Sequence, residues 1–202
     1  MRQRKGFTLI ELLIVITLLG ILAVAVLAAI NPIEQINRSR DTATRNDAGQ
    51  LISAIERYYA TRGFYPWMEG SADDAVLEEG REDLIQITGA DQLFGGGTGQ
   101  PMLQLLSGGG TAELKESYIA RIVAARANPL FIYNRGQQGD STYVCFIPRS
   151  AAIKEEGWNR CTETDEFGEL PADYPRSSAC PQTCAGPGIS AADAVDCSVC
   201  LP

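Results

Sequence analysis

Residues 7–30 form an uninterrupted apolar run in which Glu11 is the only charged side chain. As a helix with about 1.5 Å of rise per residue, the run would be about 36 Å long, enough to cross a hydrocarbon core of roughly 30 Å. Three basic residues precede it, Arg2, Arg4 and Lys5, and none follows before Arg38. Because basic residues mark the cytoplasmic side of a membrane helix, we expect a single-pass membrane protein with its N-terminus in the cytoplasm and its C-terminus outside.

A secretory signal peptide is the alternative for this segment, because Ala23-Val24-Ala25 provides a small-x-small cleavage site after a basic N-terminal region. Its apolar region would be about eighteen residues, longer than the usual 7 to 15, and would contain an acid. An ionised acid costs about 2.5 to 3.5 kcal/mol at the centre of a membrane helix and less near an end. Glu11 is therefore expected to need a cationic partner.

The residues around this acid, Lys5-Gly6-Phe7-Thr8-Leu9-Ile10-Glu11-Leu12-Leu13, resemble the prepilin processing motif of type IV pilins and type II secretion pseudopilins. The resemblance is strong from residue 5 to about residue 66 and weak beyond it. It implies that a prepilin peptidase cleaves between Gly6 and Phe7 on the cytoplasmic side, and that the new N-terminus at Phe7 is methylated. It also implies that Glu11 neutralises the terminal amine of a neighbouring subunit during assembly.

By the same resemblance, the expected function is that of a structural subunit of a type IV pilus-like filament that polymerises through its N-terminal helix. The implied partners are identical or related pilin subunits, the prepilin peptidase, an inner-membrane assembly platform and the membrane, with a surface or periplasmic filament as the final location. A pseudopilin of a type II secretion system shares this stem and is the alternative. A membrane-anchored extracellular domain that never polymerises is a further alternative.

Composition favours an assembled protein over an enzyme or a nucleic-acid binder. The chain has no histidine, which removes the commonest general base and metal ligand, and it shows no nucleophile-base constellation. We therefore expect no catalytic residues, no cofactor and no metal. The net charge is −8 and becomes −11 for the side chains left after loss of residues 1–6, so no nucleic acid is expected as a partner.

After the apolar run, Asn31-Pro32-Ile33-Glu34 is typical of a helix start, with Asn31 as the cap and Pro32 in the first helical position. The stem is therefore expected to kink or restart near Pro32. Pilin stems are commonly interrupted about one turn earlier, and Gly20 matches a glycine of that region. The expected segments are a leader at 1–6, a membrane and filament-core helix at 7–30, an amphipathic stem helix at 31–62 and a globular head at 63–202.

Over the amphipathic stem, apolar residues recur at spacings of three and four and predict one stripe that packs onto the head: Ile33, Ile36, Ala48, Leu51, Ile52, Ile55, Tyr58 and Tyr59. Asp41 and Arg45 have the i,i+4 spacing of an ion pair. The arginines at 38, 40 and 45 are expected on a solvated face, with contacts to acidic neighbours in a filament as the alternative. Gly63 is expected to end the helix as a left-handed cap.

The head is expected to be α+β with a small antiparallel sheet. Residues 111–125 have a helical pattern, and residues 130–133 and 141–148 are β-prone runs that predict a hairpin. Residues 67–100 carry acidic clusters and are expected to form a solvated loop, with a calcium loop as the alternative.

All six cysteines lie in the tail at residues 145–202, at Cys145, Cys161, Cys180, Cys184, Cys197 and Cys200. An even number of cysteines in an exported domain predicts disulfides, in any of fifteen connectivities. The alternatives are a four-thiolate zinc site built from Cys180-x3-Cys184 and Cys197-x2-Cys200, and a redox role for the latter pair.

Overall fold

The computed structural model describes residues 6–29, 31–68, 84–88, 102–108, 112–124, 127–135, 139–162 and 170–202. The chain divides into two compact units, Met1–Ile36 and Asn37–Pro202. The acidic clusters expected to form a solvated or calcium-binding loop lie outside the described residues, as does most of the expected leader.

Helix α1 (Leu9–Ala29) dominates the first unit. Among the described residues it is the one helix long and apolar enough to span a membrane, with a mean hydropathy of 2.9 over Leu9–Leu27 and none of that stretch buried. The helix is apolar on every side, as expected for a segment whose whole surface is covered by lipid or by other apolar helices.

Helix α2 (Pro32–Arg62) follows, and its buried residues repeat at helical spacing from Asp41 to Tyr58. Gly63 ends the helix at φ +79° and donates its N–H to Tyr59 O at 2.7 Å, the left-handed cap expected from the sequence. The predicted apolar stripe is only partly correct. Ile33, Ile36 and Tyr59 are 68%, 52% and 45% exposed, because burial begins at Asp41 and ends at Tyr58.

The sheet of the second unit has the order β1-β2-β3-β4, with every pair antiparallel. Its strands are β1 (Ile85–Gln86), β2 (Leu130–Tyr133), β3 (Tyr143–Phe146) and β4 (Val199–Leu201). The hairpin predicted from the two β-prone runs is present as β2 and β3, in which Leu130 is paired with Phe146 and Tyr133 with Tyr143.

Both faces of this sheet are covered, because side chains alternate across each strand and both sets are apolar. One face packs against α2 and against helices α3 (Met102–Ser107) and α4 (Glu116–Ile122). It presents Leu130, Ile132, Val144, Phe146 and Val199. The other face packs against the segment at residues 151–198, hereafter the cysteine-rich segment, through Tyr133, Tyr143, Cys145 and Cys200.

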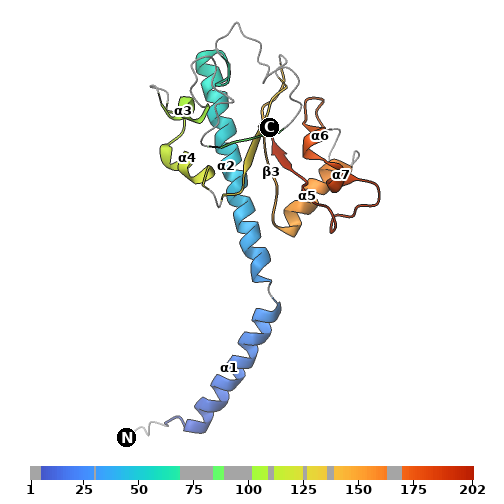
Figure 1. Cartoon of the computed structure of the whole chain (residues 1–202). Helices are drawn as coiled ribbons and strands as arrows, with labels where there is room; N and C mark the ends of the chain where they lie inside the picture. The colour runs from blue at the N-terminus through green and yellow to red at the C-terminus, as the bar shows by residue number, and fades with distance from the viewer. Residues whose placement is uncertain are drawn as a thin grey trace. The chain divides into compact units, whose positions relative to one another are not determined.

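Three further helices lie in the cysteine-rich segment, α5 (Ala151–Thr162), α6 (Arg176–Ala179) and α7 (Gln182–Ala185). In Figure 1 they lie on the opposite side of β3 from α3 and α4. Gly157 lets α5 approach β4 closely, since a Cβ at this position would lie 3.3 Å from Cys197 Cβ and 3.4 Å from Val199 Cγ2.

The helix predicted at residues 111–125 is present only as α4, which is shorter. Leu114 is buried before α4 begins, and its N–H donates to Leu106 O at 3.0 Å, so this residue is tied to α3 instead of entering a helix. The predicted fold class is confirmed: a long apolar N-terminal helix, mixed helices and strands, a small antiparallel sheet and a disulfide-linked C-terminal region.

Candidate functional site

The N-terminal end of α1 is closed by reciprocal hydrogen bonds between Thr8 and Glu11. Thr8 N and Thr8 Oγ1 donate to Glu11 Oε2 at 3.0 and 2.9 Å, and Glu11 N donates to Thr8 Oγ1 at 3.3 Å. This arrangement is a capping box, in which two side chains satisfy backbone N–H groups that have no partner within the helix.

The capping box gives Glu11 neutral donors from its own first turn, in addition to any cationic partner on another chain. A carboxylate here is also favoured by the partial positive charge of the helix N-terminus. All of these bonds to the carboxylate go to Oε2, so Oε1 is left out of the capping box. This capping role of Thr8 and Glu11 was not predicted, although Thr8-Leu9-Ile10-Glu11 fits the capping pattern before an apolar run.

Gly6 and Phe7 lie outside the helix, directly before it. The Phe7 side chain is 83% exposed, and no atom beyond the adjacent residues lies within 4 Å of the position that a Cβ on Gly6 would occupy. The peptide bond between these residues is therefore in non-helical, accessible backbone.

The surface of α1 is the largest exposed apolar feature of the described residues. Every described side chain from Gly6 to Leu27 is exposed, and large apolar residues face outward on all sides of the helix. The helix is continuous through Gly20, where an added Cβ would meet no atom within 4 Å apart from the adjacent residues and the backbone of the helix itself. Such a surface requires an apolar environment, because contiguous apolar area of this size is not left in contact with water.

The break between α1 and α2 coincides with the helix-start pattern. Helix α1 ends at Ala29 and α2 begins at Pro32. Asn31 Oδ1 accepts a hydrogen bond from Glu34 N at 3.3 Å, and Pro32 occupies the first helical position, where a missing N–H costs nothing.

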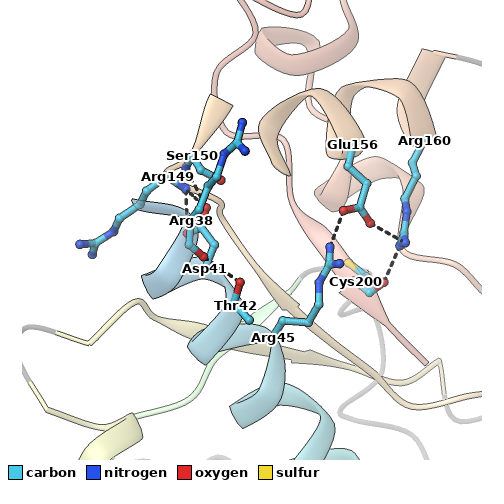
Figure 2. A network of polar contacts seen from close by, with 9 residues as sticks. All are labelled: Arg38, Asp41, Thr42, Arg45, Arg149, Ser150, Glu156, Arg160 and Cys200. Carbon is cyan, nitrogen blue, oxygen red and sulfur yellow. Dashed lines mark hydrogen bonds and ion pairs between the residues drawn. The ribbon is translucent and has the colours of Figure 1, made fainter. Parts of the chain in front are cut away.

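A polar clip formed by Asn37 and Asp41 of α2 holds residues 149–150, at the start of α5. The buried carboxylate of Asp41 accepts hydrogen bonds from Arg149 N at 3.0 Å and from Ser150 N at 2.7 Å (Figure 2). Asn37 Nδ2 donates to Arg149 O at 3.5 Å. A carboxylate at this position satisfies N–H groups at the N-terminus of α5 and complements its helix dipole.

This use of Asp41 replaces the predicted i,i+4 ion pair with Arg45. Arg45 Nη2 instead pairs with Glu156 Oε2 at 2.5 Å. Glu156 Oε1 pairs with Arg160 Nη2 at 2.9 Å, and Arg160 Nη1 donates to Cys200 O at 3.0 Å. Figure 2 shows these groups as one chain of polar contacts that runs from α2 through α5 to β4.

The six cysteines form three disulfides, and no cysteine is free. Cys145–Cys200 joins directly paired residues of β3 and β4, Cys161–Cys180 joins α5 to the end of α6, and Cys184–Cys197 joins α7 to the segment before β4. The disulfide prediction is confirmed. The zinc and redox alternatives are wrong for this structure, since no thiolate is free and Cys197 and Cys200 are bonded to different partners.

Comparison with known proteins agrees with the features of the N-terminus. Residues 1–27 match the family described as the prokaryotic N-terminal methylation motif. The chain is also similar to the fimbrial protein EcpC of Eikenella corrodens, with 38% identity over 78 residues. These residues make up 39% of this chain and 50% of EcpC, so the chain spans about half the length of the curated relative it matches. No solved structure matches it.

These two similarities support the type IV pilin family and confirm the resemblance drawn from the residues around Glu11. With the apolar α1, the match to the methylation motif is consistent with membrane anchoring.

Proposed function

We propose that this chain is a structural subunit of a type IV pilus-like filament, cleaved between Gly6 and Phe7 and assembled through α1. The observation that carries the proposal is the apolar surface of α1, which is exposed along its whole described length and lies largely within the residues 1–27 that match the methylation motif. Lipid covers this surface before assembly, and the α1 helices of neighbouring subunits cover it in the filament. Contacts between different surfaces of identical subunits build open helical filaments.

The basic residues at positions 2, 4 and 5 support a cytoplasmic N-terminus, which places the cleavage site on the side of the prepilin peptidase and the head outside. Removal of residues 1–6 leaves an amine on Phe7. In this proposal, Glu11 Oε1 accepts a hydrogen bond from the amine of a neighbouring subunit's N-terminal residue, Phe7. Glu11 Oε2 keeps its hydrogen bonds from Thr8. Glu11 thus sets the axial register of the subunits, and the function is assembly, without catalysis.

Substitutions at the capping box separate the charge of Glu11 from its hydrogen bonds. Glu11→Ala removes both, Glu11→Gln keeps an oxygen acceptor without the charge, and Thr8→Val removes the hydroxyl and keeps the carboxylate. We expect the two Glu11 variants to reduce sheared filaments by about tenfold or more, since an unpaired amine is costly in an apolar core. Thr8→Val should retain filaments.

The measurement is the yield of sheared filaments and the mass of their subunits, together with cleavage of the membrane-bound form. Wild-type filaments should contain this chain with methylated Phe7 as its first residue, and all three variants should still be cleaved. Wild-type filament yield from Glu11→Gln would contradict a role for the charge. Absence of the chain from every filament, with normal cleavage and display, would support a non-polymerising membrane-anchored domain.

A pseudopilin of a type II secretion system is the second candidate, because the stem and the processing site are common to both classes. The similarity to a fimbrial protein and the disulfide-linked C-terminal region favour the pilin. Electron microscopy separates the two, since a pilin gives filaments on the cell surface and a pseudopilin a short periplasmic assembly.

A further inference from the structure

A groove of about 600 Å³ opens beside α2 in the second unit. One face of α2 forms its first wall, over residues 40–47, and the end of α4 forms the second. Ala127 and Asn128, which precede β2, Leu130 at the start of β2 and Arg149, which precedes α5, complete the lining. Its lining includes the buried side chains of Ile122 and Leu130.

Three arginines and one acid contribute the charged side chains of this groove, Arg40, Arg121, Arg149 and Asp47. Asp47 Oδ1 pairs with Arg121 Nη2 at 2.5 Å, and the Arg121 guanidinium lies 5.3 Å from the ring centre of Tyr118. Asp47 is therefore neutralised by Arg121. Within the described part of the chain, the guanidinium groups of Arg40 and Arg149 make no ion pair or hydrogen bond.

Hydrogen bonds hold the backbone of both arginines. Arg149 N is bonded to the buried Asp41 carboxylate, and Figure 2 shows the Arg149 side chain directed away from that carboxylate. Arg40 lies on α2 one residue before Asp41, and its carbonyl accepts a hydrogen bond from Thr44 Oγ1 at 3.0 Å. Two guanidinium groups that line one groove with the apolar side chains of Ile122 and Leu130 are suited to carboxylates, which guanidinium groups bind with paired hydrogen bonds.

The rest of the chain supplies the complementary charge. Residues 63–202 contain twenty acidic and nine basic side chains, whereas residues 31–62 contain four acidic and five basic ones. The groove is thus a basic site on a protein whose head is strongly acidic. Two free guanidinium groups make too short a basic stripe to hold a nucleic acid, whose binding requires several phosphate contacts along the strand.

We infer that this groove binds acidic side chains on the head of a second copy of this chain, within the filament of the proposed function on which the inference rests. The contact is heterologous, with the groove of one subunit against an acidic surface of the next, the type that propagates a filament. It opposes the repulsion between acidic heads and adds a register contact outside the α1 core.

Charge reversal in the full-length chain tests the inference. Arg40→Glu with Arg149→Glu should lower filament yield about tenfold, because it places acids where acids must bind. The matched control is Lys115→Glu with Arg176→Glu, which changes the net charge equally at two exposed positions away from the groove, and it should give wild-type yield. Cleavage, disulfide content and the unfolding midpoint should be unchanged in both, since all four side chains are exposed.

A photoreactive amino acid at Ala43, an exposed residue of the groove, identifies the occupant. In wild-type filaments we expect adducts to acid-containing peptides of this same chain, and about tenfold less adduct in the Arg40→Glu, Arg149→Glu background. Normal filament yield from that variant, an equal loss in the control, or adducts only to lipid, nucleic acid or another protein would overturn the inference. If the wild-type chain enters no filament, the proposed function fails first, which is a distinct result.

Discussion

Asp41 joins the stem helix to a segment 108 and 109 residues later in the sequence. Its side chain is fully buried and accepts hydrogen bonds from the backbone N–H groups of Arg149 and Ser150. A buried acid that caps a helix stabilises a protein mainly because its loss leaves donors without partners.

Replacement of Asp41 by alanine should therefore lower the free energy of unfolding by about 2 to 3 kcal/mol. Asp41→Asn keeps one oxygen acceptor and should cost about 1 kcal/mol less. Chemical unfolding of the full-length chain in detergent, followed by tryptophan fluorescence, measures both. Glu155→Ala, at an exposed position of α5, is the control and should change stability by less than about 0.5 kcal/mol; an equal loss in the control would contradict the capping role.

Asp173 provides a pH-dependent contact between the cysteine-rich segment and β3. Asp173 Oδ2 accepts a hydrogen bond from Ser141 N at 2.6 Å, and Oδ1 accepts one from the Tyr143 hydroxyl at 3.0 Å. Burial alone would raise the pKa of Asp173, but these hydrogen bonds outweigh it and hold the pKa below its ordinary value of 3.8. Burial and the bond to Asp173 raise the pKa of Tyr143 to about 12, so its hydroxyl stays a donor.

The lowered pKa predicts the direction of the pH effect. The contact with Asp173 stabilises the fold above about pH 4 and is lost as pH falls through the lowered pKa, because the unfolded chain takes up the proton first. Asp173→Asn should lower the unfolding midpoint at neutral pH and flatten its fall in acid. Thermal unfolding from pH 2 to 7 tests this, and parallel curves for the wild type and the variant would exclude the contribution of Asp173.

At the level of elements, the disulfides are nested: Cys145–Cys200 encloses the other two along the chain. Its sequence separation is 55, against 13 for Cys184–Cys197. In the chain-entropy account a longer loop restricts the unfolded chain more, although the inner cross-links shorten this one. All four cysteines are buried, so the packing loss on substitution is similar.

We therefore expect Cys145→Ala with Cys200→Ala to lower the free energy of unfolding by about 2 to 4 kcal/mol, and by more than Cys184→Ala with Cys197→Ala. Denaturant unfolding of the oxidised full-length chain gives both values. A larger loss from the inner pair would show that packing around α7, not restriction of the unfolded chain, sets the order.

The elements that the sequence predicted are those with a local pattern. The apolar α1, the amphipathic α2 with Gly63 at its end, and the β2–β3 hairpin each have a periodicity or a turn residue that marks them. Helix α5 and strand β4 have no comparable local signal. Helix α5 depends on a cap from Asp41 and on the close approach at Gly157, and β4 is three residues long and is fixed by its pairing with β3.

The same distinction separates the parts of the candidate site. Gly6, Phe7 and Glu11 are found from a local motif, and the Thr8–Glu11 capping box could have been found in the same way. The groove lined by Arg40 and Arg149 could not have been predicted from a local motif. Its two guanidinium groups lie more than one hundred residues apart in the sequence, and only the folded chain brings them to one surface.

At the scale of the whole molecule, the two units have different surfaces. The first exposes an apolar helix with one acid, and the second covers both faces of its sheet and carries most of the acidic side chains. In the proposed filament, the first unit supplies cohesion and the second keeps the outer surface charged and soluble. The basic groove is the exception on the acidic unit, which is why we assign it to a contact between subunits.

The polar clip of Asn37 and Asp41 also determines how the second unit would respond to mechanical tension. Asn37 and Asp41 lie nearer the N-terminus of α2 than the apolar contacts that begin at Ala48. A force that pulls on the N-terminal end of α2 therefore acts first on the clip. The clip passes the load to residues 149–150, which follow β3, and β3 is covalently joined to β4 through Cys145–Cys200. Force applied to the stem therefore enters a sheet whose last strand pair cannot be unzipped by breaking hydrogen bonds alone.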